Sequence, residues 1–278
     1  MTTPNLSAQS TFSGTAVRNN QASLPLQIAL VTWRNLVTIF RTPTALVPPL
    51  VISIFFLVIY ESTLGKAAGF IPNLSGNSYL GFILPLSIVS SSLSGSGIAA
   101  QNLVRDIESG YFDKLLLTPV SRTALLLGPI LAGALILGVQ ASVVIGVAML
   151  LGLQSATGFA GLAVVVGLAI LLGTGFAGFT VSAALGSGSA AATQGASFLF
   201  FPLTFLTASF VPLDLLDGWL QTAAKLNPIT YVLEAMRGLL NTGWDSTALT
   251  QGVAACLILG VAMYALAVYA LRVRTRRS

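Results

Sequence analysis

The sequence predicts an all-α integral membrane protein with six transmembrane helices, and composition is the first observation that predicts this fold class. Apolar residues make up 55% of the 278-residue chain and charged residues only 8%. A typical soluble chain has roughly 25% charged residues. Thirteen basic and eight acidic side chains cannot cover a soluble body of this size. A soluble enzyme or a nucleic-acid-binding domain is therefore close to excluded, although the net charge is +5.

Hydropathy is the second observation, because six apolar stretches are long enough to cross a membrane. About 20 mostly apolar residues span roughly 30 Å of hydrocarbon as a helix. The predicted spans are residues 43–60, 79–100, 124–153, 159–185, 190–211 and 247–271. Prolines inside the first, second and fifth spans predict kinks, which neighbouring helices can tolerate.

The basic residues are the third observation, and they predict the orientation. Ten of the 13 would lie on one side of the six spans, which identifies that side as cytoplasmic. Both termini are then cytoplasmic, and we expect a multi-pass protein of the inner (plasma) membrane. Residues 1–23 lack the apolar core of a signal peptide and are expected to be a disordered tail. A single transmembrane domain at 24–271 and a basic tail at 272–278 would follow.

Residues 24–41 are expected to form an amphipathic helix in the cytoplasmic interface, before the first span. Its apolar stripe comprises Leu26, Leu30, Trp33, Val37 and Phe40. Its polar stripe comprises Gln27, Arg34, Thr38 and Arg41. Two interpretations stay open. The helix is either a topological anchor or an elbow helix that packs on a cytoplasmic partner.

The loop at residues 102–122 holds six of the 21 charged residues. Gly110 permits a turn. Phe112, Leu115 and Leu116 then form one apolar face of a short helix, which Pro119 ends. A short amphipathic helix at the tip of a loop can dock a soluble protein. The alternative is a solvated charged loop that only contributes to the orientation.

Residues 212–241 are too polar to span the membrane and are expected to form two short helices of an outer re-entrant hairpin. Asn227 and Pro228 are typical of a helix start, as N-cap and first helical residue. Asp217, Gln221 and Lys225 would lie on one helical face, where an ion pair can form. Glu234 and Arg237 are expected to pair. The alternative is an ordinary extracellular loop.

The inner part of the second span is rich in serine: Ser87, Ser90, Ser91, Ser92, Ser94 and Ser96. Small hydroxyl side chains permit close contact and hydrogen bonds between helices, so a packing role is favoured. Alternatively, Ser87, Ser91 and Ser94 line a substrate path.

The chain lacks an energy source and a catalytic centre of its own. It contains no G-x-x-x-x-G-K-[ST] phosphate-binding loop and no buried carboxylate, histidine or lysine as an obvious proton relay. It has no histidine and one cysteine, which excludes disulfides, zinc sites and histidine acid–base catalysis. We therefore expect no enzyme activity, metal or cofactor in this chain. Energy for uphill transport would come from another polypeptide.

Three segments resemble the permeases of type-2 class ABC exporters, especially the daunorubicin/doxorubicin-resistance drug-efflux permeases. Residues 105–122, RDIESGYFDKLLLTPVSR, look like the coupling-helix signature of that family. Residues 208–240 are similar to its outer re-entrant region in the pieces FVP, WLQ, LNPITY and EAMRG. Residues 33–43, WRNLVTIFRTP, fit its elbow helix and entry into the first span.

This resemblance implies a homodimer or a paired permease, bound to two cytoplasmic ATPase subunits that hold ATP and Mg²⁺. The ATPase-coupling residues that it implies are Arg105, Asp106, Glu108, Gly110, Asp113, Lys114, Leu116, Thr118, Pro119 and Arg122. Arg34 and Arg41 would flank the inner entrance. The outer gate would comprise Asp217, Lys225, Asn227, Pro228, Glu234 and Arg237. Asp106 stands where many relatives carry Glu, and it keeps the charge.

The preferred function is an ATP-driven exporter of a hydrophobic drug, an antibiotic or a lipid-like molecule. An exporter of a lipid-linked glycan or polysaccharide is disfavoured by the few aromatic residues in the third and fourth spans. A third hypothesis is a non-transporting membrane scaffold that docks a cytoplasmic protein through residues 102–122. ATP hydrolysis separates these hypotheses, because only a transporter must stimulate it or depend on it. No span carries the ring of polar residues typical of a passive channel.

Overall fold

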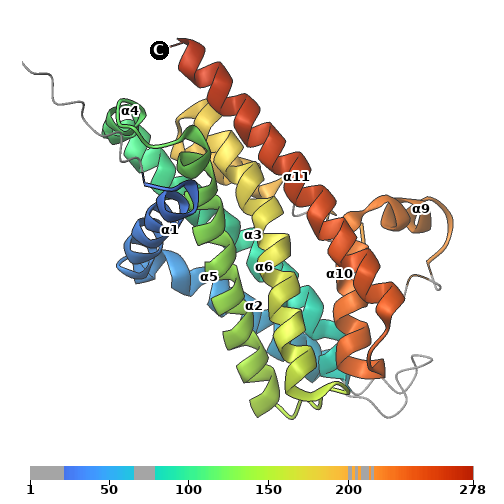
Figure 1. Cartoon of the computed structure of the whole chain (residues 1–278). Helices are drawn as coiled ribbons and strands as arrows, with labels where there is room; N and C mark the ends of the chain where they lie inside the picture. Colours follow the sequence, from blue (N-terminus) through green and yellow to red (C-terminus); the bar gives the residue numbers. More distant parts are fainter. Residues whose placement is uncertain are drawn as a thin grey trace, which may run out of the picture.

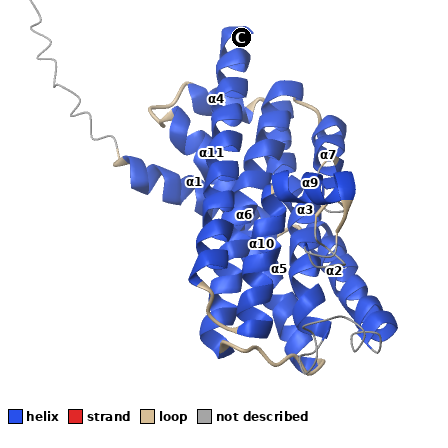
Figure 2. Cartoon of the chain, turned by 90° about the vertical axis from the view of Figure 1, so that its right-hand side faces the viewer, coloured by secondary structure: helices blue, strands red, loops and turns tan. Residues whose placement is uncertain are grey.

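The computed structural model describes residues 22–65, 79–199, 202–203, 206–207, 213 and 216–277. Within these residues the regular secondary structure is entirely helical (Figure 2). The predicted N-terminal tail at residues 1–23 lies almost wholly outside them. An all-α fold is therefore confirmed for the part of the chain that can be described.

Among the residues that the structure describes, five helices are long and apolar enough to cross a membrane. They are α2 (Pro43–Leu64), α3 (Tyr79–Glu108), α5 (Arg122–Leu150), α6 (Gly158–Ser187) and α11 (Ser246–Arg277). They correspond to the predicted spans one to four and six. The predicted span at 190–211 begins as α7 (Ala190–Phe198), but most of its second half lies outside the described residues. Helices of sufficient length and apolarity thus occupy five of the six predicted spans, and the fifth span, at 190–211, stays a prediction.

Shorter helices occupy both ends of the bundle (Figure 1). α1 (Leu24–Phe40) lies across the long helices, and α4 (Tyr111–Leu116) lies near the C-terminus (Figures 1 and 2). α9 (Gly218–Leu226) and α10 (Pro228–Arg237) precede α11, with a π-helical turn, η3 (Gly238–Thr242), after α10. The two short helices expected within residues 212–241 are therefore present. We call the two ends of the bundle the α4 end and the α10 end.

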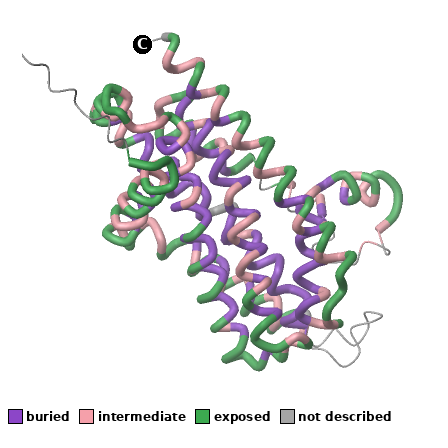
Figure 3. Tube along the Cα trace, viewed as in Figure 1, coloured by how far each residue is buried: buried purple, intermediate pink, exposed green. Residues whose placement is uncertain are grey.

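α3 is the central helix of the bundle. In its most apolar stretch, 94% of the residues are buried, against 17% for α2 and for α11. Its small residues allow neighbouring helices to approach, and Figure 3 shows this buried interior between exposed outer faces. The outer faces of α2 and α11 are therefore free to contact lipid.

Three clusters of buried apolar residues fill this interior among the described residues. The largest joins α2, α3, α5, α6, α10 and α11 towards the α10 end, and the smallest packs α1 against α3 and α5. The third, which we call the α4-end cluster, joins the last turns of α3, α6 and α11 to the start of α5. The α4-end cluster is the part of the core that positions α4.

Candidate functional site

The tight turn before α4 is made by a glycine. Gly110 has φ +70° and precedes the first residue of α4. L side chains avoid this left-handed region, whereas glycine adopts it freely. The turn and the short helix predicted within residues 102–122 are therefore both present. Their geometry directs the chain away from α3 and back towards α5.

One aromatic side chain anchors α4 to the bundle. Phe112 is buried at 2% exposure inside the α4-end cluster, and Leu116 packs against that cluster as a partly buried residue. The predicted apolar face of α4 thus points into the bundle. Leu116, predicted to contact an ATPase, is turned partly towards the chain's own core.

The opposite side of α4 and its flanks is exposed. The exposed members of the predicted coupling set are Arg105, Glu108, Asp113, Lys114, Thr118, Pro119 and Arg122. Leu117 is the most exposed apolar residue of this loop, with 89% of its surface accessible. Sequence reasoning missed Leu117. The sequence offered one indication of its exposure. Leu117 comes directly after the residues that form the Phe112–Leu116 face, and so it cannot lie on that face.

Arg34 joins three helices at the α4 end. Its Nη2 lies 2.7 Å from Oδ1 and 2.9 Å from Oδ2 of Asp106, at the end of α3. Its guanidinium also lies 4.4 Å from the ring centroid of Tyr111, the first residue of α4. The side chain predicted to flank an entrance therefore ties α1 to α3 and α4. Asp106 correspondingly points at α1, while Arg41 lies exposed.

A second contact fixes α1 to the start of α5. The Oε1 atom of Gln27 accepts a hydrogen bond from the backbone N–H of Ser121 at 2.8 Å. The hydroxyl of Ser121 in turn caps α5 by accepting from the N–H of Ala124 at 3.1 Å. The loop that carries α4 is thus held by α1 near both of its ends.

The apolar stripe of α1 faces away from the bundle. Its exposed members are Leu26, Leu30, Trp33 and Phe40, whereas Thr32, Asn35 and Ile39 are buried against the other helices. An apolar face that no other described helix covers suits a helix lying in the membrane interface. Its role as an elbow helix stays a prediction.

At the α10 end, Asn227 performs the predicted capping. Its Oδ1 accepts from the N–H of Ile229 at 3.0 Å, and Pro228 is the first residue of α10. Its Nδ2 donates to the carbonyl of Leu203 at 2.8 Å. One amide thus starts α10 and holds it to the segment before α9.

Arg237 ends α10 in a buried position. Its side chain is 8% exposed, and its Nε donates to the carbonyl of Phe82 in α3 at 3.1 Å. The guanidinium lies 3.7 Å from the ring centroid of Phe82. Glu234 is half-buried one turn earlier. Asp217 and Lys225 form no ion pair within the described residues, so the pair that their spacing allows is not present there.

The serines of α3 are placed inside the protomer. Ser87 is buried, and its carbonyl accepts from the hydroxyl of Ser53 in α2 at 2.8 Å. Ser91 is also buried and donates to Oε1 of Gln140 in α5 at 3.3 Å. These contacts join neighbouring helices, as the packing interpretation predicts. The side chain of Ser94 lies outside the described set, and a substrate path along these serines stays a prediction.

No cluster of three or more acidic, histidine or cysteine side chains suited to a metal ion occurs among the residues with described positions. The site at the α4 end consists of an exposed tip, an aromatic anchor and the contacts of Arg34 with α3 and α4.

Comparison with known proteins assigns the family. Residues 26–241 match the model of the ABC-2 type transporter family. A probable doxorubicin resistance ABC transporter permease protein, DrrC of Mycobacterium tuberculosis, is 28% identical over 217 residues, which are 78% of each chain. The daunorubicin resistance ABC transporter permease protein DrrB1 of Streptomyces coeruleorubidus is 27% identical over 81% of this chain and 80% of its own. The putative transport permease ycf38 of Cyanophora paradoxa is 27% identical over 77% and 73%. The chain is therefore a member of the ABC-2 type transporter family.

Proposed function

We propose that this chain is the transmembrane permease subunit of an ATP-binding-cassette exporter that moves a hydrophobic drug, antibiotic or lipid-like substrate. The relatives named as doxorubicin and daunorubicin resistance permeases support this substrate class. The observation that carries the proposal is the geometry of α4. It presents Leu117 and charged side chains outwards while Phe112 is fixed in the core.

In the proposed mechanism, α4 transmits motion from a separate ATPase subunit. ATP and Mg²⁺ bind to that partner, which supplies the energy. Displacement of the exposed tip pulls on Phe112, and through it on the last turns of α3, α6 and α11. It also pulls on α1 through Tyr111 and the Arg34–Asp106 pair. Packed interiors transmit such shifts because they are close-packed and do not deform continuously.

The proposed assembly has two ATPase subunits and two permeases, with a second copy of this chain as the expected partner. Both termini and α4 lie on the cytoplasmic side of the inner (plasma) membrane. The basic C-terminal turns of α11 and the charged loop around α4 support this orientation through the positive-inside rule. The outer gate is assigned to α9 and α10.

Affinity purification of the tagged chain from native membranes in mild detergent tests the proposal. Mass spectrometry of the wild type should find a roughly stoichiometric ATPase with a Walker A loop. The Glu108→Arg and Leu117→Asp variants should lose it, because both residues are exposed on the α4 side. Lys225→Glu is the matched control, since it reverses an exposed charge at the α10 end.

A second measurement follows transport itself. Leu116→Pro and Glu108→Arg should uncouple ATP hydrolysis from drug export while the protein remains inserted, because proline breaks α4. Normal export by both variants would overturn the assignment of α4. Absence of any ATPase from well-folded wild-type protein would instead favour a scaffold that docks another cytoplasmic protein.

A further inference from the structure

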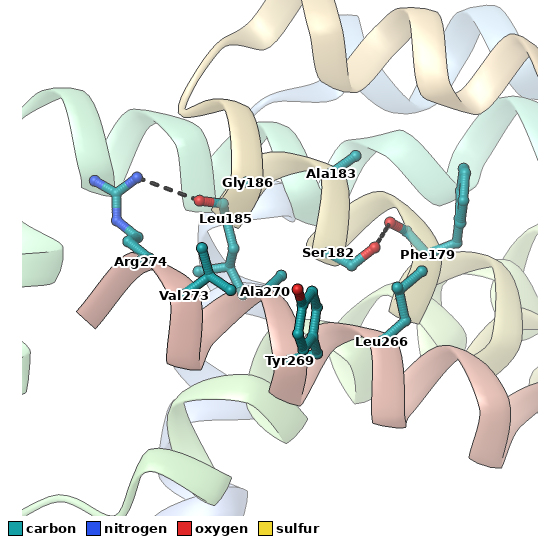
Figure 4. Close-up of a pocket in the computed structure, with 10 residues that line it drawn as sticks. All are labelled: Phe179, Ser182, Ala183, Leu185, Gly186, Leu266, Tyr269, Ala270, Val273 and Arg274. Atoms are coloured by element: carbon teal, nitrogen blue, oxygen red, sulfur yellow. Dashed lines mark hydrogen bonds between the residues drawn. The ribbon is translucent and has the colours of Figure 1, made fainter. Parts of the chain in front are cut away.

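A groove of about 590 Å³ runs between α6 and α11 towards the α4 end. Figure 4 shows its walls, which are mainly apolar and include Phe179, Leu185, Leu266 and Val273. Gly186 leaves space in one wall, because a Cβ there would meet no atom within 4 Å. Leu266 and Tyr269 are 39% and 66% exposed, so the groove opens on the outer face of the bundle.

Arg274 lies at one end of this groove. Its Nη1 is 3.4 Å from the carbonyl of Leu185, and its guanidinium is 6.0 Å from the ring centroid of Phe112. These contacts hold the cation at the edge of the apolar walls (Figure 4). Neither α6 nor α11 contains an aspartate or a glutamate, so the two walls carry no negative charge of their own.

The length of α11 places this cation at the surface of the membrane. Its 32 residues extend about 48 Å, whereas the hydrocarbon core is about 30 Å thick. The last turns therefore reach the headgroup region, where Tyr269 matches the aromatic belt and arginines meet lipid phosphates. Arg272 and Arg276 flank Arg274 along the same helix.

We propose that the α6–α11 groove binds one anionic phospholipid, with an acyl chain along the apolar walls and the headgroup phosphate at Arg274. A guanidinium suits a phosphate because it donates two parallel hydrogen bonds. A second copy of this chain fits the groove less well, because a symmetric contact would bring two arginine-rich helix ends together. This lipid site is additional to the proposed export function and does not depend on it.

Quenching by brominated lipid tests the site. The full chain carries Tyr269→Trp as a reporter, and Trp33, Trp219 and Trp244, which are all exposed, are replaced by Phe. It is reconstituted in vesicles that contain brominated phosphatidylglycerol or brominated phosphatidylcholine. We expect the phosphatidylglycerol to quench the reporter preferentially, and Arg274→Gln to weaken this preference roughly fivefold.

Two further variants separate a groove from a diffuse positive surface. Arg276→Gln removes the same charge from an exposed position outside the groove and should leave the preference unchanged. Gly186→Leu should fill the groove and reduce quenching by both lipids. Equal quenching by the two lipids in the parent protein would overturn the proposal. An equal loss of the lipid preference in Arg276→Gln would also overturn it. Shielding of the reporter from both lipids by a second copy of the chain would overturn it as well.

Native mass spectrometry of the chain without the tryptophan replacements gives an independent measurement. The wild type and Arg276→Gln should retain a bound phosphatidylglycerol after detergent purification, whereas Arg274→Gln should lose it. Equal retention by all three proteins would contradict a site at Arg274. The readout needs no ATPase, so failure of the lipid site is distinguishable from failure of the export function.

Discussion

Two arginines contact opposite ends of α3 and are held in different ways. Arg34 pairs with Asp106 near the C-terminal end of α3, and the two side chains are 40% and 21% exposed. Arg237 contacts Phe82 near the N-terminal end and is only 8% exposed. The two contact points are 24 residues apart on the helix, which is about 36 Å.

The two arginine contacts differ in strength. An ion pair with partly exposed partners contributes about 1 kcal/mol or less, because water competes for both charges. A desolvated guanidinium over an aromatic ring contributes about 2 kcal/mol or more, and its removal also loses the hydrogen bond to the Phe82 carbonyl. Of the two arginine contacts, the one at the α4 end, where we propose that an ATPase binds, is therefore the weaker. The one at the α10 end is the stronger.

The largest expected effect is the loss of the buried arginine. Arg237→Ala should lower the free energy of unfolding by about 3 kcal/mol, since the ring contact and the bond to the Phe82 carbonyl are both lost. Thermal unfolding in detergent measures the difference. Lys225→Ala, on the exposed side of α9, should stay within about 0.5 kcal/mol of the wild type. Equal melting temperatures for the two variants would remove the contrast between the ends.

The next largest effect is expected from replacing two glycines that have similar backbone conformations. Gly110 and Gly218 have φ of +70° and +63°, and a Cβ on either would meet no atom within 4 Å. Alanine at either position should therefore cost about 1–2 kcal/mol through backbone strain alone. Only Gly110→Ala should also reduce recovery of the ATPase, because Gly110 orients α4. Similar ATPase recovery from both variants, at similar loss of stability, would contradict a role for the orientation of α4.

The sequence predicts the local features of both ends. Apolar length predicts five of the long helices that the structure contains, and the Asn227-Pro228 pair predicts the start of α10. The turn at Gly110 and the apolar face of α4 are also predicted. These features depend on residues within one or two helical turns, so their spacing along the chain determines them.

The contacts between distant segments could not be predicted in this way. Asp106 lies 72 positions after Arg34, and nothing in the spacing indicates that they pair. Arg237 was expected to interact with Glu234, and sequence reasoning missed Phe82, which lies 155 positions earlier. The exposure of Leu117 depends on which face of α4 meets the core. Each of these depends on how the helices are packed, which periodicity within one helix does not determine.

A smaller effect is expected at the α4 end. In a double-mutant cycle of Arg34→Gln and Asp106→Asn, the coupling energy should be about 0.5–1 kcal/mol, because both partners are partly exposed. The proposed ATP-dependent export should nevertheless fall in both single variants, since α1 loses its link to α3. The exchanged pair, Arg34→Asp with Asp106→Arg, should recover part of the export. A coupling energy of zero, with normal export in both single variants, would show that the pair is incidental.

The smallest expected effect is that of salt on stability. Salt distinguishes the contributions of Arg34 and Arg237 without any change in the core. Raising the ionic strength from about 0.01 M to 1 M shortens the Debye length from roughly 30 Å to 3 Å. The stability difference between the wild type and Arg34→Gln should therefore shrink by a few tenths of a kcal/mol, because water and salt reach the pair. The difference between the wild type and Arg237→Ala should shrink less, since its guanidinium is shielded by α3 and α10. If both differences shrank equally, Arg237 would be accessible to solvent, and a rigid α10 end would no longer explain the contrast.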